Sequence, residues 1–264
     1  MKVTEVRAST ALSPSRLPGL DWALNPYRGC GHGCVYCYSP DVLRLKETEP
    51  WGSFVEVRKN LPVLLARERK ACSGVVGLGT VTDPYQPAEE RTRLTRYCLE
   101  QLAKAKCSVC VQTKSDLVTR DIDIISGMGN AEVGITITSV NEELARQLEP
   151  GAPEPARRVA ALKELSGAGI RTWVFLGPVI PGINDSCEQM AAVIDAAEKA
   201  GCGRVLFDKL RLKPMVRERM RKMLGFARSE RIFRLVGDRE WEERVTVDIE
   251  VLCDDAKMKS EKAF

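Results

Sequence analysis

The chain has 264 residues, of which 44% are apolar and 29% are charged, and it carries a net charge of +4. This composition is that of a globular protein able to bury a sizeable core, and the length fits one large domain or one domain with a small appendage. Since no run approaches the roughly 18 apolar residues of a membrane helix, and residues 1–16 lack the apolar core of a secretory signal, we expect a cytoplasmic protein.

The chain begins with an expected N-terminal segment over residues 1–19 and a first strand near 21–25. A loop follows at 25–38 and reads NPYRGCGHGCVYCY, with its cysteines spaced C-x3-C-x2-C. In a reducing compartment ten cysteines point to metal binding or redox chemistry more than to disulfides. A single histidine, His32, argues against sites built from several imidazoles.

From residue 74 onward, short apolar runs alternate with amphipathic stretches. Strands are expected at 74–80, 107–113, 132–139, 170–180 and 204–208, and helices at 88–105, 117–127, 141–149, 155–168 and 187–200. This rhythm predicts βαβ units with a parallel sheet. With the first strand the count reaches six, so we expect an α/β fold, a partial (β/α)6 barrel of the TIM type. Catalytic residues in such barrels follow the carboxyl ends of the strands.

After Asp208 the pattern changes, and we take residues 209–264 as a short C-terminal extension. Pro214 begins an expected basic helix, with Val216, Met220 and Met223 facing inward. Residues 244–251 (RVTVDIEV) alternate apolar and polar side chains, which predicts an edge strand. The last eight residues, KMKSEKAF, are expected to be frayed.

The positive charge is concentrated in residues 204–234, which hold eleven Lys and Arg against three Asp and Glu. Such a basic block can bind a polyanion, so nucleic acid is a candidate partner. The alternative is a solvated helix face with no ligand.

The three thiolates of Cys30, Cys34 and Cys37 can hold three irons of a cubane cluster and leave the fourth iron open. A glycine-containing loop suits this role because its backbone must wrap the cluster. A zinc site with His32 as the fourth ligand is the alternative. Three buried structural thiols are a further one, although a loop this rich in glycine makes a poor core.

The pattern C-x3-C-x-aromatic-C, with Tyr36 in the aromatic position, resembles the signature of the radical S-adenosylmethionine superfamily. Further segments, among them TVTDPYQPAE, QTKSDLVTRDID and LGPVIPGIND, are similar to the branch related to spore photoproduct lyase, from about residue 20 to 215. The resemblance implies a barrel over residues 20–208, a [4Fe–4S] cluster, S-adenosylmethionine and an external one-electron donor of the ferredoxin or flavodoxin type. It also implies reductive cleavage of S-adenosylmethionine to a 5′-deoxyadenosyl radical, which abstracts hydrogen from a substrate the sequence does not identify.

At the methionine end of the cofactor, the resemblance implies roles for three residues. Thr82 and Asp83 fall where other members contact the methionine ammonium group, and Lys114 would pair with the methionine carboxylate as a point charge. The ordinary alternatives are a turn that starts at Asp83 and a surface lysine at position 114.

At the adenosine end, Tyr36 and Pro178 would lie near the adenine. Thr136 and Thr138 fall where relatives place small polar groups that reach the ribose or the methionine, although threonine also favours strands for its shape alone. Arg158 would be a further polar contact, and its alternative is a solvated position on a helix.

One departure from spore photoproduct lyase concerns hydrogen return to the substrate. That family places a cysteine at the end of the second strand, where this chain has Thr80. Because a hydroxyl O–H bond is far harder to break homolytically than a thiol S–H bond, repair of spore photoproduct is not expected. Tyr85 and Cys72 are the remaining candidates for a hydrogen donor.

Five further cysteines raise the question of a second cluster: Cys107, Cys110, Cys187, Cys202 and Cys253. Cys107 and Cys110 fall in one strand and three positions apart, so their side chains should point to opposite faces. We expect them to be core thiols. The substrate classes left open are nucleic acid, a peptide and a small molecule, beside a non-catalytic iron–sulfur, zinc or nucleic-acid-binding protein.

Overall fold

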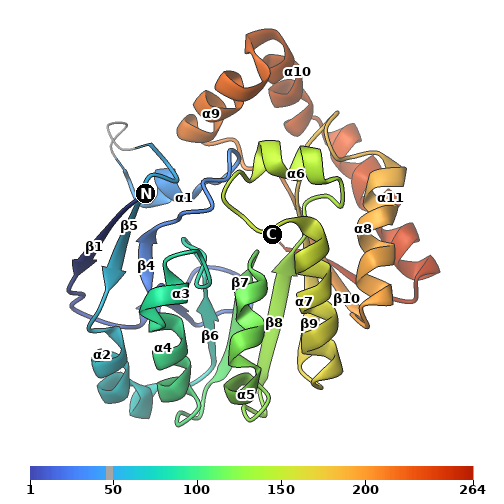
Figure 1. The fold of residues 1–264 in the computed structure, drawn as a ribbon. Helices are drawn as coiled ribbons and strands as arrows, with labels where there is room; N and C mark the ends of the chain where they lie inside the picture. The colour runs from blue at the N-terminus through green and yellow to red at the C-terminus, as the bar shows by residue number, and fades with distance from the viewer. Residues whose placement is uncertain (46–49, 264) are drawn as a thin grey trace.

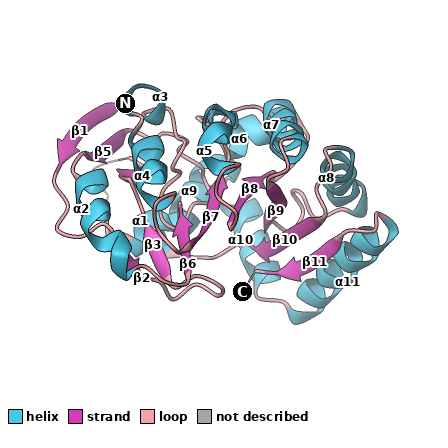
Figure 2. Ribbon diagram, turned by 90° about the horizontal axis from the view of Figure 1, so that it is seen from below, coloured by secondary structure: helices cyan, strands magenta, loops and turns pink. Residues whose placement is uncertain are grey.

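A computed structural model describes residues 1–45 and 50–263; Phe264, the last residue of the expected extension, lies outside them. The main sheet has eight strands in the order β11-β10-β9-β8-β7-β6-β3-β2. Neighbouring strands from β3 to β11 are parallel, and β2 (Ser13–Pro14) alone runs antiparallel to its neighbour. The sheet curves into an open barrel with most helices on its outer side (Figures 1 and 2).

Six strands form the barrel wall in the order that the sequence predicts. They are β3 (Trp22–Leu24), β6 (Val75–Leu78), β7 (Ser108–Thr113), β8 (Ala131–Thr136), β9 (Arg171–Val179) and β10 (Arg204–Lys209). Each pairs in parallel with the next, and helical segments connect them, as βαβ units require. The expected partial (β/α)6 barrel is therefore confirmed.

The outer layer contains the helices α2 (Leu61–Glu68), α4 (Leu94–Leu102), α5 (Ile122–Ile125), α7 (Pro155–Gly167) and α8 (Cys187–Lys199). Helix α6 (Glu142–Leu148) lies across the top of the barrel (Figure 1), where Leu148 packs in one apolar cluster with Cys34 and Tyr36. Helix α7 illustrates how the sequence specifies the outer helices. Pro155 occupies the first helical turn, where its missing N–H needs no partner. Leu162 and Leu165 are buried against the sheet, as their helical spacing predicts.

Two expected helices are interrupted. Residues 88–105 form α3 (Glu89–Thr92) and α4, separated by Arg93 in the left-handed conformation with φ 50°. The buried Glu89 carboxylate accepts the backbone N–H of Thr95 at 2.8 Å, so it caps the second helix from within the fold. The stretch 117–127 begins with a 3-10 turn, Asp116–Asp121, before α5.

A second, three-stranded sheet lies beside the barrel in the order β1-β5-β4. It joins β1 (Lys2–Val6), β5 (Phe54–Arg58) and β4 (Tyr27–Gly29), so the N-terminal segment pairs with residues fifty positions away. A short 3-10 turn, Arg69–Ala71, extends α2. The cysteine loop runs from the end of β4 to α1 (Ser39–Val42) and is therefore anchored at both ends.

The C-terminal extension contains α9 (Pro214–Leu224), α10 (Phe226–Val236), α11 (Arg239–Asp255) and β11 (Lys259–Lys262). Helix α9 begins at Pro214 as expected, with Val216 and Met220 buried and Met223 half-buried. Figure 1 shows α9 and α10 above the barrel mouth and α11 beside α8. Within the described residues, no helix is both long and apolar enough to cross a bilayer.

The strand predicted at 244–251 is wrong, because these residues lie in α11. Val245 and Ile249 are buried, whereas Val247 and Val251 are 55% and 53% exposed. Side chains four positions apart share one face of a helix. A segment with an apolar residue at every second position can therefore form a helix in which every second apolar side chain is buried and the others are exposed.

The expectation of a frayed C-terminus is also wrong for the described residues. Lys259–Lys262 form β11, which extends the barrel sheet in parallel to β10. The edge strand thus exists, but fifteen residues later than the alternating pattern placed it. Its residues are mostly charged, which suits a strand at the edge of a sheet.

Candidate active site

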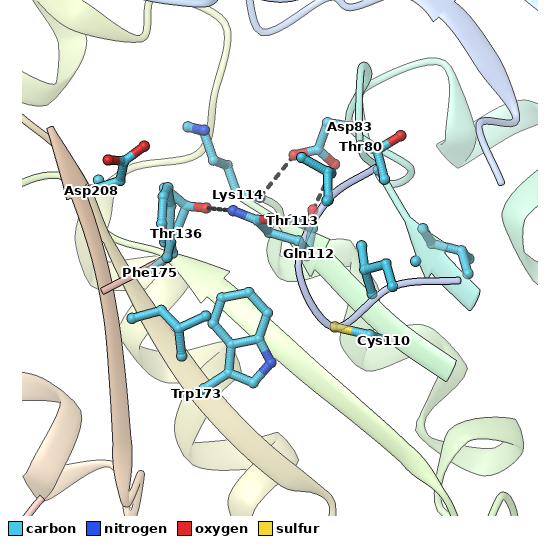
Figure 3. Close-up of a pocket in the computed structure, with 18 of the residues that line it drawn as sticks. Thr80, Asp83, Cys110, Gln112, Thr113, Lys114, Thr136, Trp173, Phe175 and Asp208 are labelled. Carbon is cyan, nitrogen blue, oxygen red and sulfur yellow. Dashed lines mark hydrogen bonds between the residues drawn. The ribbon is translucent and has the colours of Figure 1, made fainter. Parts of the chain in front are cut away.

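The barrel encloses a cavity of about 460 Å³, which is lined by residues of β6 to β10, by residues 17–20 before β3 and by the cysteine loop after β4. Cys30, Cys34 and Cys37 form part of its wall. Figure 3 shows Asp83, Lys114, Thr136 and other strand-end side chains gathered in the same space. The expectation that site residues follow the strands is met for Asp83 after β6 and Lys114 after β7.

The cysteine loop is shaped by two tight turns. The N–H of Gly33 donates to the carbonyl of Cys30 at 3.3 Å, and the N–H of Cys37 donates to the carbonyl of Cys34 at 3.2 Å. Gly33 has φ +60°, and a Cβ there would come within 3.3 Å of Gly52. Glycine adopts this left-handed conformation without strain and leaves room for the close approach of Gly52.

All three thiols are free, and the surroundings of Cys30 and Cys34 disfavour the thiolate form. Burial raises the pKa of Cys34 to about 12, although nearby Lys114 acts in the opposite direction. Burial also raises the pKa of Cys30, with Asp83 and Cys34 acting in the same direction. Metal ligation requires deprotonated thiols, so a bound iron cluster would supply the positive charge that this loop lacks.

The geometry does not favour the alternative zinc site. Among the described residues, no three His, Cys, Asp or Glu side chains converge as ligands of one metal ion. A cubane needs no such convergence, because each thiolate binds a different iron. His32 Nδ1 lies 3.3 Å from Asp83 Oδ2 instead, while its buried Nε2 has no hydrogen-bond partner in the described part of the chain.

Asp83 is held ionised in a buried position. Its Oδ1 accepts the hydroxyl of Thr113 at 2.6 Å, and its Oδ2 accepts the backbone N–H of Lys114 at 2.8 Å. Burial alone would raise its pKa, but His32 and these two donors outweigh burial and hold the pKa at about 2. The site thus contains a fixed negative charge near the cysteine loop.

Lys114 supplies the opposite charge. Its Nζ lies 5.6 Å from the centre of the Tyr36 ring, a cation–π distance. Burial acts to lower its pKa, but Cys34, Glu149 and Asp83 outweigh it, so the pKa of Lys114 is raised and the ammonium is retained. A ligand with one negative and one positive group would find both partners here.

Behind this pair is a buried network that the sequence did not reveal. The Tyr36 hydroxyl donates to Glu149 Oε1, the Thr138 hydroxyl donates to the same oxygen at 2.9 Å, and Arg158 Nη1 lies 2.5 Å from Glu149 Oε2. In the sequence, Glu149 is only the last residue of the helix expected at 141–149. The one sequence signal for its role is its place directly after the strand–helix unit that carries Thr136 and Thr138.

Of the other residues predicted to bind the cofactor, some line the cavity and others lie outside its lining. Thr136 and Pro178 line it, and Thr136 accepts a weak hydrogen bond from Gln112 at 3.4 Å. Thr82 lines the wall too, but its hydroxyl donates a hydrogen bond to the carbonyl oxygen of Gly29 at 2.7 Å. Thr138 and Arg158 are outside the lining and act through Glu149.

Asp208 is a lining residue that the sequence analysis did not single out. It stands near the end of β10, where burial raises its pKa and Arg211 opposes the shift. The rule that barrel sites follow strand ends would have found it.

Neither candidate hydrogen donor is among the residues that line the cavity. The Tyr85 hydroxyl is buried and donates to Asp121 at 3.0 Å. Cys72 is buried in the main core, where Cys107 raises its pKa in addition to burial. Thr80 does line the cavity, and its hydroxyl accepts the amide of Asn25 at 2.9 Å.

The five cysteines considered for a second cluster do not lie together in the fold. Cys107 packs in the main core while Cys110 faces the cavity, so the expected opposite orientation is confirmed. The expectation of a core thiol is confirmed for Cys107 and wrong for Cys110, because the face of the strand that carries Cys110 is turned toward the cavity. Cys187 is exposed at the start of α8, and Cys202 and Cys253 are buried before β10 and in α11. In the described ranges, these positions form no group that could hold a metal.

Comparison with known proteins identifies the family of the chain. The family model described as Radical SAM superfamily matches residues 24–194. An uncharacterised protein of Methanocaldococcus jannaschii is 34% identical over 185 residues, which cover 70% of each chain. An uncharacterised protein of Mycobacterium tuberculosis is 31% identical over 205 residues, which cover 74% of this chain and 60% of that one.

The fold has a counterpart among solved structures. Spore photoproduct lyase complexed with dinucleoside spore photoproduct superposes with a TM-score of 0.77, covering 99% of this chain and 82% of that chain at 15% identity. At this identity the likeness concerns the fold. Because the family model covers well over half of the chain, the protein belongs to the radical S-adenosylmethionine superfamily, whose cofactors are a [4Fe–4S] cluster and S-adenosylmethionine.

Proposed function

We propose that Cys30, Cys34 and Cys37 hold the cluster and that this enzyme cleaves S-adenosylmethionine reductively. The observation that carries the proposal is that these thiols share one cavity with a fixed carboxylate and a fixed ammonium. When bound, the cluster supplies the electron that breaks the C5′–S bond and gives a 5′-deoxyadenosyl radical for hydrogen abstraction from the substrate. Superfamily members take that electron from an external donor, here of the ferredoxin or flavodoxin type.

The chain's own residues would orient the nucleotide. Asp83 would attract the methionine ammonium, and Lys114 would attract the methionine carboxylate. Charges in a buried cavity interact more strongly than charges in water, so this pair would fix the methionine end. Thr136 would meet the ribose, and Pro178 would lie against the adenine.

Tyr36 and its buried partners would then form a support rather than a contact for the nucleotide. The hydroxyl of Tyr36 is engaged by Glu149, whose charge is balanced by Arg158. The ring therefore has a fixed orientation beneath Lys114. Such a network places a catalytic ammonium without leaving a buried charge uncompensated.

Anaerobic reconstitution tests the proposal. We expect about four irons per chain and 5′-deoxyadenosine when dithionite and S-adenosylmethionine are added. Cys34→Ala should abolish product, because three thiolates are needed to hold the cubane. Cys187→Ala is the matched control, since that thiol is exposed on α8 and far along the chain. Product from Cys34→Ala, or a wild-type protein that binds a single zinc, would overturn the assignment.

For the substrate we propose nucleic acid, with the basic block 204–234 as its contact surface. Helices α9 and α10 lie above the barrel mouth (Figure 1), and Arg228, Arg231 and Arg234 are exposed on α10. Exposed cations beside a cavity can neutralise phosphates while one nucleotide enters the site. The name of the superposed lyase, which acts on a dinucleoside photoproduct, agrees with this choice.

Salt-dependent binding tests the nucleic-acid proposal. For duplex DNA, log affinity falls linearly with log salt concentration. Replacing Arg228, Arg231 and Arg234 with Gln should make this negative slope smaller in magnitude by about 2–3. The control replaces three exposed cations on other helices, Arg146, Lys163 and Lys199. Equal slopes for both triple variants would remove the block as the site, and no measurable binding by the wild type would favour a peptide or a small molecule.

A further inference from the structure

Helix α9 is attached to the cysteine loop by a side chain from the far end of the sequence. Arg219 Nε donates to the carbonyl oxygen of Val35 at 3.0 Å, and Arg219 Nη2 donates to the carbonyl oxygen of Cys37. One planar guanidinium thus bonds two backbone oxygens on either side of Tyr36. The fixed fork of arginine suits such a double contact, which lysine cannot reproduce.

The start of α9 is fixed to the same region. Asp41, on α1 directly after the cysteine loop, accepts the backbone N–H of Met215 at 3.2 Å. This carboxylate satisfies one of the unpaired donors at the N-terminus of α9 and lies at the positive end of the helix dipole. Helix α9 therefore meets the loop and its following helix at two separate points.

Apolar packing covers the space between these points. A second hydrophobic core joins Cys34 and Tyr36 of the loop to Val216 and Met220 of α9 and to Phe233 of α10. The helical pair α9–α10 is thus a cover over the cysteine loop as well as a basic surface. The face of α9 that carries Arg219 is turned toward the loop.

The charge of Arg219 is kept close to the thiols. Burial lowers the pKa of Arg219, while Cys37 and Asp41 act to raise it. A guanidinium remains protonated in proteins, so the positive charge persists beside Cys37. This charge has no part in the proposed binding of the nucleotide, and in the sequence Arg219 is one of the eleven Lys and Arg residues of the basic block 204–234.

We propose that Arg219 is a positioning residue for the cluster, which fixes the Val35–Cys37 backbone and favours the reduced cluster through its charge. The inference rests on the proposed ligation by Cys30, Cys34 and Cys37. One-electron reduction adds negative charge to a cluster, and cluster potentials respond to nearby charge, hydrogen bonds and solvent. A half-buried cation beside a ligand should therefore make reduction easier.

Two substitutions separate the geometric effect from the electrostatic effect. Arg219→Gln removes both the positive charge and the double hydrogen bond to the loop. The ratio of reduced to oxidised cluster at a fixed potential should therefore fall about tenfold, which means that the midpoint potential of the cluster is lowered by about 59 mV for a one-electron couple. Iron release to a chelator should be about tenfold faster, as for other residues that support metal ligands. Arg219→Lys keeps the charge, so we expect nearly wild-type potential but faster iron release.

The control is Arg239→Gln, which removes one positive charge from an exposed site on α11. Potential is measured by redox titration of the reduced-cluster EPR signal, and iron by chelator absorbance. A wild-type protein that does not take up about four irons overturns the ligation itself. If the wild type loads and Arg219→Gln matches Arg239→Gln in both measurements, the positioning role is wrong.

Comparison of the two Arg219 variants separates the electrostatic part of the proposal from the positioning part. If Arg219→Gln and Arg219→Lys lower the potential equally, the charge has no part, and the electrostatic half of the proposal is overturned. If Arg219→Gln fails to fold, Arg219→Lys decides alone. Faster iron release at unchanged potential then supports the role, and unchanged release overturns it.

Discussion

At the scale of single residues, the site depends on Glu149, which is buried and balances Arg158. We predict that Glu149→Gln destabilises the fold by about 3–5 kcal/mol, because it leaves the buried Arg158 charge without an opposite charge. Glu154→Gln is the control, since that exposed carboxylate is 4.0 Å from Arg146 and such pairs contribute at most about 1 kcal/mol. Anaerobic urea unfolding measures both, and equal midpoints would contradict the role assigned to Glu149.

The same carboxylate predicts a pH dependence. Burial acts to raise the pKa of Glu149, but Arg158 and Lys114 outweigh it, so the pKa lies below its ordinary value of 4.5. A lowered pKa means that the ionised carboxylate stabilises the fold fully above that ordinary value and that this contribution is lost as the pH falls further. In urea unfolding between pH 7 and pH 3, Glu149→Gln should therefore lose less stability than the wild type.

Residues differ in how far the sequence could identify them. The roles predicted for Asp83 and Lys114 come from the resemblance of their segments to the radical S-adenosylmethionine superfamily, and their places directly after strands agree with the position of functional groups in such barrels. Glu149 was missed because its partner Tyr36 is 113 positions away and their contact exists only in the fold. His32 was considered as a zinc ligand, whereas its partner is Asp83.

At the scale of elements, α11 shows where a period of two misleads. Its buried stripe is Trp241, Val245, Ile249 and Cys253, each four positions apart. We predict that Ile249→Ala costs about 2–5 kcal/mol, whereas Val247→Ala, at a site that is 55% exposed, changes stability by less than about 0.5 kcal/mol. A strand with both side chains on one buried face would give two comparable losses, so thermal or urea unfolding distinguishes helix from strand.

The barrel strands could be predicted because they are buried and rich in β-branched residues, so the amino-acid composition of each short segment indicates a strand. Strand β11 could not, since its sequence is Lys-Ser-Glu-Lys and has no apolar residue. It forms because the edge of β10 offers unpaired backbone groups. Pairing of that kind depends on where α11 ends, and no local pattern records it.

At the scale of the whole molecule, β11 makes the last strand of an open barrel. Glu261 and Ala263 line the same cavity as the cysteine loop, and the Ala263 N–H donates to the carbonyl of Phe207 at 2.9 Å. Glu261 and Ala263 therefore form part of one side of the space in which the proposed radical chemistry occurs.

Removal of residues 259–264 tests whether this strand pairing is real. Without β11, β10 becomes the edge of the sheet and pairs only with β9. We predict that those amide hydrogens of Arg204–Lys209 that donate to β11 exchange at least about tenfold faster, because they lose their hydrogen-bond partners. Amides of β7, at the centre of the sheet, provide the internal control and should be unchanged. Equal protection of β10 in both chains would mean that the last residues are frayed in solution, as their sequence alone suggests.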